Sequence, residues 1–425
     1  MSTIPMPDDL VGAQTLVVRT VAIDEVGTAH DLLRLLPAEA PLSWVRRGDG
    51  LVGWGSAARI DVTGPDQIAT AQAAWTALVD RAVVRDEVGL PGTGPVAFGS
   101  FAFDPTTADG LLVVPSVLVG RRDGQTWLTT VGPAATRRTT VSVAAPVRAP
   151  GSVRYSSGAL EPHGWADRVA DAVAVIRSGG VDKVVLARDV VARTTDPLDV
   201  RWALDRLARR YGTCWTFCVD GLIGATPELL VRTERGLVTS RVLAGTIRRT
   251  GDDEADLARA GVLAHSSKNL EEHEYAVRSV AGALAPYCTS ANVPDVPFVL
   301  SLPNVLHLAS DITGVLASAT GSLELAAALH PSAAVCGTPA PAAADLIRQL
   351  EQMDRGRYAG PVGWTGADGD GEWGIALRSA QVDPTDPRTV RLFAGCGVVA
   401  ASDPAAELAE SEAKLEPMRY ALGSS

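Results

Sequence analysis

The sequence predicts an α+β protein, and three observations support this fold class. Residues 1–132 contain short apolar runs, such as "TLVVRTVAI" and "GLLVVPSVLVG", which are split by Gly, Pro and Asp in a pattern typical of strands. More strand-like runs follow after residue 180. Segments with helical spacing occur among them, but strands and helices do not alternate strictly, which favours α+β over a doubly wound sheet.

The expected elements can be placed in order along the chain. Residues 136–164 hold Pro, Ser, Gly and loose basic residues with little periodicity, so we expect a linker there. A helix follows, ended by "SGG" at 178–180, because apolar residues recur at helical spacing at Trp165, Val169, Ala172, Val173 and Ile176. Further strands are predicted at 181–191, 214–225, 236–246, 371–382 and 389–399, and further helices at 252–286, 321–330, 340–353 and 404–421.

Composition excludes some classes of protein. The 425 residues are 46% hydrophobic, enough for a large core, and length alone suggests two or three domains. With 38 basic and 49 acidic residues the net charge is -11, which argues against a nucleic-acid-binding protein. The N-terminal "MSTIPMPDDLVG" does not resemble a secretory signal, and no apolar run reaches the roughly 18 residues that a membrane span needs. We therefore expect a cytoplasmic protein with no membrane partner.

The five cysteines give no sign of a metal site. Cys214 and Cys218 form a CxxxC that lacks both a second pair and a histidine at zinc-like spacing. We expect all five cysteines to be reduced packing residues.

Lys183 lies just inside the apolar run "VDKVVLARDVV", residues 181–191. Such a run suits a covered strand, and most lysines in this position extend their ammonium group towards water. Burial would instead lower the pKa of the lysine, and a lysine that is neutral near pH 7 can act as a base.

Several carboxylates and one histidine are candidate partners, although each has a plainer interpretation. Glu228, in "IGATPELL", could be an acid or could accept backbone hydrogen bonds at a helix start. Glu271, Glu272 and Glu274 are typical of a solvated helix face, and His307, in "LPNVLHLASDITG", is typical of a hydrogen-bonded core histidine. Near the C-terminus, helical spacing places three residues on one face, where they could form a surface salt-bridge ladder: Glu407, Glu410 and Lys414.

Taken together, the motifs resemble those of chorismate-utilising enzymes of the isochorismate synthase kind. The match covers about residues 155–418, with ten motifs in the family's order: "KVVLAR", "IGATPELLV", "LAGT", "SSKNLEEH", "NVLHLASDITG", "LHPSAAVCGTP", "RGRYAGPVGW", "IALRSA", "AGCGVVAASDP" and "ELAESEAK". The resemblance implies the anthranilate synthase or chorismate-binding fold, one α+β unit of two stacked antiparallel sheets with surrounding helices. It also implies a variable strand-rich N-terminal part of that fold at 1–150 and a chorismate-binding catalytic region at 151–425, in place of separate domains.

The resemblance implies a division of catalytic roles. Lys183 would be the general base that activates a water to attack C2 of chorismate, and Glu228 the general acid that protonates the departing C4 hydroxyl. Hydroxide is a poor leaving group, so a protonated carboxyl beside it is chemically needed. His307 matches a histidine near the ring. The product would be isochorismate.

The resemblance also implies a Mg²⁺ site and contacts to the substrate. Glu272 and Glu410 match the magnesium-binding glutamates, with Glu407 contributing from behind them or through a water, and Mg²⁺ prefers such hard oxygen ligands. Arg378 and Tyr358 match residues that hold the enolpyruvyl carboxylate, a task that suits a planar guanidinium. The remaining expected substrate contacts are Gly245, Thr246, Ala334, Gly395, Gly397 and Lys414.

Two motifs depart from the family pattern. "SSKNLEEH" has Asn269 and Leu270 where relatives often have Asp or Glu followed by Arg, and "RGRYAG" has Arg357 where Trp is common. Neither departure replaces a proposed catalytic group, but Arg357 is expected to alter the mouth of the site.

Lys183 and Ala334 guide the choice among relatives. The amine-forming anthranilate and aminodeoxychorismate synthases lack this lysine and take ammonia from a glutaminase, so we expect water as the nucleophile and no glutaminase subunit. Salicylate synthases share the equivalents of Lys183 and Glu228 but tend to have Thr at the position of Ala334; an isochorismate synthase is therefore favoured and a salicylate synthase is the alternative. A non-catalytic chorismate-binding protein should have lost one of these groups. The resemblance implies a monomer, and the sequence does not choose between a menaquinone and a siderophore route.

Overall fold

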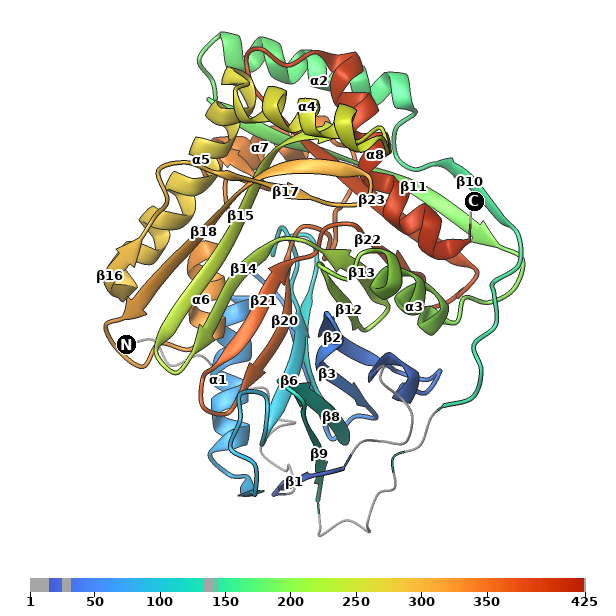
Figure 1. Ribbon diagram of the computed structural model, residues 1–425, viewed down its shortest axis with the longest axis vertical. Helices are drawn as coiled ribbons and strands as arrows, with labels where there is room; N and C mark the ends of the chain where they lie inside the picture. The colour runs from blue at the N-terminus through green and yellow to red at the C-terminus, as the bar shows by residue number, and fades with distance from the viewer. Residues whose placement is uncertain (1–14, 25–31, 134–140, 142–143, 424–425) are drawn as a thin grey trace.

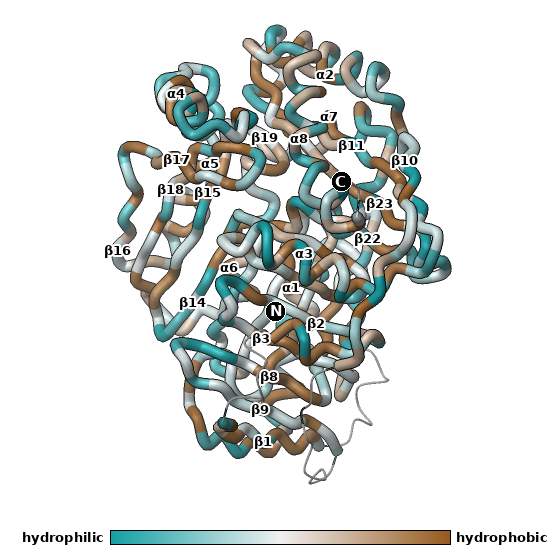
Figure 2. Tube along the Cα trace, turned by 45° about the vertical axis from the view of Figure 1, so that its right-hand side comes forward, coloured by the Kyte–Doolittle hydropathy of each residue, from teal (hydrophilic) through white to brown (hydrophobic). Residues whose placement is uncertain are grey.

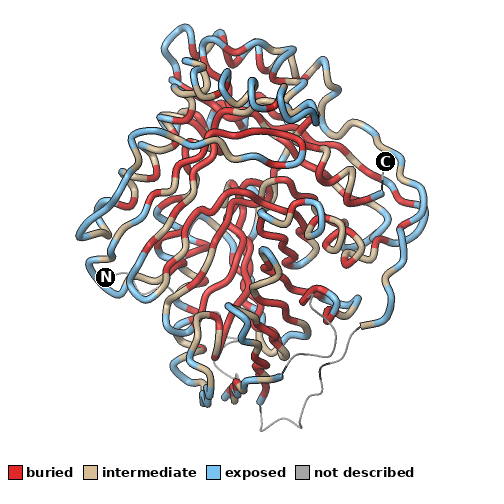
Figure 3. Tube along the Cα trace, in the orientation of Figure 1, coloured by how far each residue is buried: buried red, intermediate tan, exposed pale blue. Residues whose placement is uncertain are grey.

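Two large β-sheets face each other across a shared core, and helices surround them (Figure 1). The computed structural model describes residues 15–24, 32–133, 141 and 144–423. Buried residues run along the central strands of both sheets, while the outer turns of the helices are exposed (Figure 3). This arrangement confirms the predicted α+β fold with two stacked sheets.

The larger sheet has 13 strands and contains the strand of Lys183. Its neighbours in order are β10 (Val153–Ser157), β11 (Lys183–Thr194), β23 (Thr389–Val398), β22 (Ser379–Val382), β13 (Leu222–Thr226), β12 (Trp215–Val219), β2 (Leu42–Arg46), β3 (Asp49–Trp54), β8 (Val117–Arg122), β9 (Gln125–Gly132), β1 (Val17–Ala22) and β5 (Val83–Asp86), with β19 (Gly337–Thr338) paired to β11.

The smaller sheet has 10 strands, and one of them, β14, begins directly after Glu228. Its order is β16 (Cys288–Asn292), β18 (Val305–Leu316), β15 (Leu237–Arg248), β14 (Leu229–Glu234), β21 (Gly371–Ile375), β20 (Pro361–Gly366), β6 (Val96–Ser100), β7 (Gly110–Val114) and β4 (Ala58–Val62), with β17 (Phe298–Ser301) paired to β18.

Strands from both ends of the chain pair within each sheet. β12 pairs with β2 in the larger sheet, and β20 pairs with β6 in the smaller one. Both pairs are antiparallel, as predicted, whereas β1 and β5 pair in parallel at the outer edge of the larger sheet. The boundary expected at residue 150 therefore separates two parts that share the same sheets, and it stays a prediction.

The helices cover the outer faces of the sheets, and their amphipathic patterns explain why. Apolar residues follow the central strands, whereas polar residues are frequent on the outer turns (Figure 2). The helices are α1 (Gln67–Val79), α2 (Pro162–Arg177), α3 (Val200–Arg210), α4 (Asp253–Ala264), α5 (Ser267–Leu284), α6 (Ser322–Leu329), α7 (Ala340–Leu350) and α8 (Pro404–Leu422), with short 3₁₀ turns at Leu32–Leu35 and Ala285–Tyr287. None of them combines the length and apolar character needed to cross a bilayer, within the described residues.

Two sequence predictions need correction. The helix expected over 252–286 is broken in two at His265 and Ser266, because the Ser266 side chain accepts a hydrogen bond from the backbone N–H of Asn269 and so caps the start of α5. The linker expected over 136–164 contains β10, which pairs with β11, and the first turn of α2. Residues 134–140 and 142–143 of that stretch lie outside the described residues.

Candidate active site

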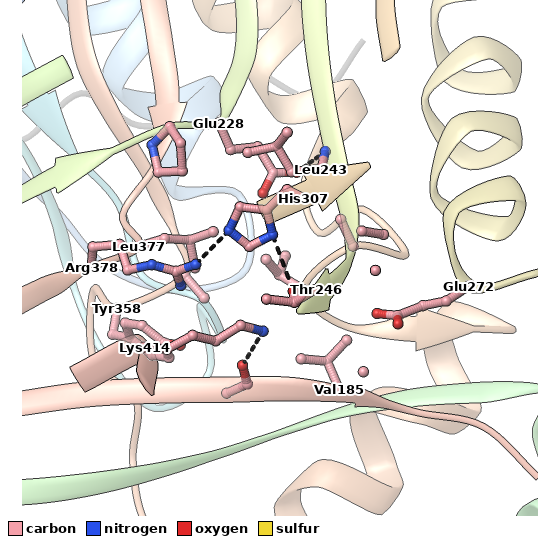
Figure 4. A pocket seen from close by; sticks show the side chains of 18 of the residues that line it. Val185, Glu228, Leu243, Thr246, Glu272, His307, Tyr358, Leu377, Arg378 and Lys414 are labelled. Carbon is pink, nitrogen blue, oxygen red and sulfur yellow. Dashed lines mark hydrogen bonds between the residues drawn. The ribbon is translucent and has the colours of Figure 1, made fainter. Parts of the chain in front are cut away.

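A cavity between the two sheets collects most of the predicted site residues (Figure 4). Its walls come from β15 and β18 of the smaller sheet, β11 and β23 of the larger sheet, and helices α5 and α8. The predicted residues that line it are Glu228, Gly245, Thr246, Glu272, His307, Ala334, Tyr358, Arg378, Gly395, Gly397 and Lys414. Segments that lie up to 229 residues apart, from Val185 to Lys414, thus meet at one place.

Lys183 is fully buried at the start of β11, beside the wall of this cavity. Its Nζ lies 3.5 Å from Glu272 Oε1 and 3.4 Å from the Glu272 carbonyl oxygen. A Cβ atom built on Gly397 would lie 3.2 Å from Lys183 Cε, so the lysine passes close to that glycine. Burial lowers the pKa of Lys183, although Glu272 opposes the shift. Lys183 thus lies next to two residues that line the cavity, Glu272 and Gly397, but does not line the cavity itself.

The chain has only three lysines among its 38 basic residues, and all three pair with glutamates at this site. Lys183 pairs with Glu272, Lys268 with Glu407 at 2.5 Å, and Lys414 with Glu410 at 2.6 Å. Elsewhere the protein uses arginine, which cannot lose its proton. Compact ammonium groups are thus confined to the cluster of buried and half-buried glutamates.

Glu228 lies on another side of the cavity, at the end of the turn that enters β14 (Figure 4). Burial raises the pKa of its carboxyl to about 8, against the opposing effects of the Leu243 backbone N–H and Lys183. The Leu243 N–H points at Glu228 Oε1 from 3.5 Å. Glu228 is therefore protonated at neutral pH, while burial holds the pKa of Lys183 below its usual value, which separates an acid from a base.

His307 is held between Arg378 and Thr246 (Figure 4). Arg378 Nη2 donates to His307 Nε2 at 2.8 Å, and guanidinium groups can only donate. The ring proton of the neutral imidazole therefore lies on Nδ1 and is donated to Thr246 Oγ1 at 3.0 Å. Burial, then Arg378 and Lys414, lower the pKa of His307 well below its usual value, so the ring stays neutral.

Arg378 keeps one donor unused although it is buried. Its Nε–H has no hydrogen-bond partner within the part of the chain that the structure describes, and its backbone φ of 49° is in the left-handed region. A buried donor without a partner costs free energy, and an anion bound in the cavity would supply the missing acceptor. His307 fixes the direction of this guanidinium.

Gly245 interrupts β15 where the strand borders the cavity. The pairing of β15 with β18 shifts between Ala244 and Thr246, and Gly245 has φ of 80°. A side chain there would be strained and would meet Asn269 at 3.0 Å. The glycine thus allows the bulge that places Thr246 opposite His307.

Gly397 and Lys414 complete the side of the cavity formed by β23 and α8. A Cβ atom on Gly397 would lie 2.0 Å from Glu272 Oε1, so only glycine leaves room for that carboxylate. Lys414 Nζ donates to the Gly395 carbonyl oxygen at 2.9 Å (Figure 4). Burial alone would lower the pKa of Lys414, but Glu410 and Cys396 raise it above the usual value, so this lysine stays charged.

The three predicted metal-binding glutamates lie in the same region but do not form one ligand set. Glu407 and Glu410 on α8 place ligand atoms within 4.8 Å of each other and of Cys396 Sγ, whereas Glu272 is turned towards Lys183. Glu407 and Glu410 do not form the exposed ladder that their spacing allowed, because Glu407 is buried. Burial, then Glu410, raise the pKa of Glu407.

Sequence reasoning missed two residues of this region and misplaced a third. Arg355 lines the cavity and donates to the carbonyl oxygens of Val185 at 2.7 Å and Val335 at 2.9 Å. Lys268 pairs with Glu407. Both residues lie inside motifs quoted above, "RGRYAG" and "SSKNLEEH". Their positive charge is the feature of the sequence that could have identified them as site residues.

Arg357, which was expected to alter the mouth of this cavity, is not among its lining residues. Its Nη2 donates to the Asp220 carbonyl oxygen at 2.7 Å and to Gln381 Oε1 at 2.9 Å, and it lines a different cavity. The two cavities share Arg355 and Tyr358 as walls. All four residues of "RGRY" line this second cavity, but of these only Arg355 and Tyr358 also reach the first one.

The arrangement can do proton-transfer chemistry on an anion. It places a buried lysine and a protonated carboxyl at different sides of one cavity, next to Arg378 and Lys414 as fixed cations. A substrate with more than one carboxylate would find both cations in the same cavity.

The comparisons with known proteins agree with this geometry. Residues 15–423 match the family model described as "Chorismate binding enzyme". The chain is 39% identical over 275 residues to the isochorismate synthase DhbC of Bacillus subtilis, covering 62% of this chain and 68% of the relative. It is 35% identical over 413 residues to the salicylate biosynthesis isochorismate synthase of Pseudomonas aeruginosa, covering 90% and 85%. The crystal structure of the menaquinone-specific isochorismate synthase MenF of Escherichia coli superposes with a TM-score of 0.80 at 26% identity, over 96% of this chain and 95% of that one.

Proposed function

Because the chain belongs to the family of chorismate-binding enzymes, we propose that it is an isochorismate synthase that converts chorismate into isochorismate with Mg²⁺. The observation that carries the proposal is the pair of opposed pKa shifts of two buried groups at one cavity. Burial lowers the pKa of Lys183 below its usual value, which makes the amine a better proton acceptor, and raises the pKa of Glu228 to about 8, which keeps the carboxyl protonated near neutral pH.

In this mechanism Lys183 removes a proton from a water, whose oxygen forms a bond with C2 of the ring. Both conjugated double bonds of the ring shift as the C4–O bond breaks, and Glu228 gives its proton to the departing hydroxyl, which leaves as water. Addition and loss of water balance, so the reaction is an isomerisation. Arg378 and Lys414 hold the carboxylates of the substrate, and the neutral His307 keeps Arg378 in place.

The carboxylates fit a magnesium ion. Glu407 and Glu410 already place oxygens close together although this raises the pKa of Glu407, and Glu272 lines the catalytic cavity near them. A hard divalent cation would stabilise this like-charge cluster and offset the repulsion between the glutamates and a dianionic substrate. Glu407 and Glu410 would hold it, joined by Glu272 once that carboxylate turns from Lys183, and Lys268 and Lys414 are the counter-charges present without it.

The direct test is product analysis by liquid chromatography. We expect the purified protein, given chorismate and Mg²⁺ but no ammonia, to accumulate isochorismate without salicylate or pyruvate. Anthranilate or aminodeoxychorismate on addition of ammonia would indicate an amine-forming enzyme. Unchanged chorismate in the presence of Mg²⁺ would contradict the proposal.

A second candidate is a salicylate synthase, which would go on to eliminate pyruvate in the same cavity. The Pseudomonas aeruginosa relative is named for salicylate biosynthesis, yet its name also gives the isochorismate synthase activity. Ala334 lines the cavity of this chain, where salicylate synthases tend to have Thr, and this favours release of isochorismate. Equal amounts of salicylate and pyruvate in the product assay would reverse the choice.

Removal of the metal should stop turnover. We expect a chelator to abolish activity and an excess of Mg²⁺ to restore it, because otherwise the glutamates repel the substrate. Calorimetry should show Mg²⁺ binding that Glu410→Gln weakens at least about tenfold, since a carboxylate ligand is lost. Glu274→Gln is the matched control, because Glu274 lies on the exposed face of α5 and pairs with Arg278. Full activity in chelator, or equal Mg²⁺ affinity of the Glu410 variant, would count against the metal site.

A further inference from the structure

A different cavity lies between the two sheets and has a strongly basic lining. It is about 260 Å³ in volume and is bordered by β2, β3, β8, β9 and β12 of the larger sheet and by β14, β20 and β21 of the smaller sheet. Five arginines line it against three acidic residues: Arg46, Arg47, Arg121, Arg122 and Arg232 against Asp49, Asp123 and Glu372. This local excess of positive charge is unusual in a chain whose net charge is -11.

Two of the five arginines are already neutralised. Arg122 pairs with Glu234 at 2.7 Å, and Arg121 lies 3.6 Å from Asp49. Arg46, Arg47 and Arg232 have no carboxylate within 4.0 Å among the residues that the structure describes. Three cationic side chains around one cavity therefore form no ion pair within the part of the chain that the structure describes.

Arg46 is held rigidly in this position. Its guanidinium carbon lies 4.0 Å from the centre of the Trp215 ring, and its Nε donates to the Thr213 carbonyl oxygen at 2.8 Å. Trp215 in turn stacks on Trp44 with ring centres 6.2 Å apart. The Nη1 and Nη2 groups of Arg46 have no hydrogen-bond partner in the described chain, so its donors remain free for a ligand.

The half-buried Glu372, which also lines this cavity, is committed to other donors. Glu372 Oε2 accepts hydrogen bonds from the indole N–H groups of Trp44 at 2.8 Å and Trp215 at 3.0 Å. Arg241, whose charge also acts on Arg46, donates two hydrogen bonds to the Asp311 carboxylate. Burial, then Arg241 and Arg47, lower the pKa of Arg46 to about 10, although Glu372 opposes the shift. The half-buried guanidinium of Arg46 thus carries a charge that Glu372 offsets only in part, and a charge removed from water without a partner is costly.

We propose that this cavity binds a small oxyanion with two negative charges, a phosphate or a dicarboxylate, between Arg46, Arg47 and Arg232. Planar guanidinium groups bind the oxygens of such anions in pairs, with two parallel hydrogen bonds to each group. The pinned indoles of Trp44 and Trp215 keep Arg46 oriented before the anion arrives, so little order is lost on binding. The site is separate from the catalytic cavity, since the two share no lining residue.

Isothermal titration calorimetry with inorganic phosphate and with malonate tests the proposal, with acetate and chloride at equal ionic strength as monovalent controls. Because the catalytic cavity also attracts carboxylates, the titrations use the Arg378→Gln variant, whose catalytic anion site is weakened. We expect one divalent anion bound per chain, and at least about tenfold weaker binding after the further changes Arg46→Gln and Arg232→Gln. Phosphate binding alone, or malonate binding alone, would identify which of the two chemistries the site takes.

Matched variants keep the test sharp. Arg85→Gln, which removes an exposed arginine that pairs with Glu87, should leave binding unchanged. Arg46→Lys keeps the charge but loses the planar group, so its affinity should fall between those of the parent and the glutamine variant. Thermal unfolding of each variant checks that it is folded. No binding of either divalent anion, or equal binding by the Arg46→Gln, Arg232→Gln protein, would overturn the proposal.

Discussion

The Lys183→Ala protein should lose turnover by about 10²–10⁴-fold, the range that a general base typically contributes. The lysine is fully buried, and burial lowers its pKa, so it can take the proton of the attacking water. The measurement is kcat for chorismate consumption with saturating Mg²⁺. Since the amine acts on the water and not on the substrate carboxylates, KM should change far less than kcat.

Removal of Lys183 also leaves Glu272 without its nearest cation, so loss of activity could reflect damage to the site. Lys183→Arg separates the two causes. Arginine keeps a positive charge beside Glu272 but cannot become a neutral base, so this variant should be folded and as inactive as Lys183→Ala. Activity of the arginine variant within tenfold of the parent would show that the charge, and not proton transfer, is what matters at this position.

Loss of the Glu228 proton should have the second large effect. Burial raises the pKa of this carboxyl to about 8, and the acid role needs the protonated form. A group with a raised pKa keeps its proton below that pKa and loses it as pH rises, so kcat/KM should fall on the alkaline side with a midpoint near pH 8. The rate profile between pH 6 and about 10 is the measurement.

Glu228→Gln is the matched variant for this role. The amide has nearly the shape of the protonated carboxyl and can still accept from the Leu243 N–H, but it has no acidic proton to give. We expect kcat to fall by about 10²–10⁴-fold, with chorismate binding retained. An alkaline limb that persists unchanged in the residual activity of this variant would assign the titration to another group.

Much of the fold and of the site can be predicted from the sequence because the evidence is local. Period-2 and buried apolar runs give the strands, and Trp165 to Ile176 give a helix whose apolar face is indeed buried. The ten motifs bring in Glu228, Glu272, His307, Arg378 and Lys414, which the structure gathers around one cavity. The resemblance to chorismate-utilising enzymes supplied roles that no single residue pattern could.

Other predictions failed where the outcome depends on distant partners. β10 was hidden in an expected linker because its sequence, "VRYSS", is weakly apolar and becomes a strand by pairing with β11. Arg357 was misplaced because the direction of a side chain in a tight segment depends on backbone geometry, and its partners Asp220 and Gln381 are far away in sequence. Glu407 was compatible with a surface ladder by its spacing alone, and only packing buries it beside Lys268.

The sequence by itself determined which residue types stand at which spacing, and therefore the α+β class, the motif set and the family. Tertiary structure decided the environment of each group: the burial that lowers the pKa of Lys183 and raises that of Glu228, and the meeting of all three lysines with three glutamates. It also decided that Arg46, Arg47 and Arg232 line one cavity, where none of them forms an ion pair with a described residue. The physical reason is that a pKa or an ion pair depends on distance and desolvation in space, which strand pairing across 200 residues sets and local sequence does not.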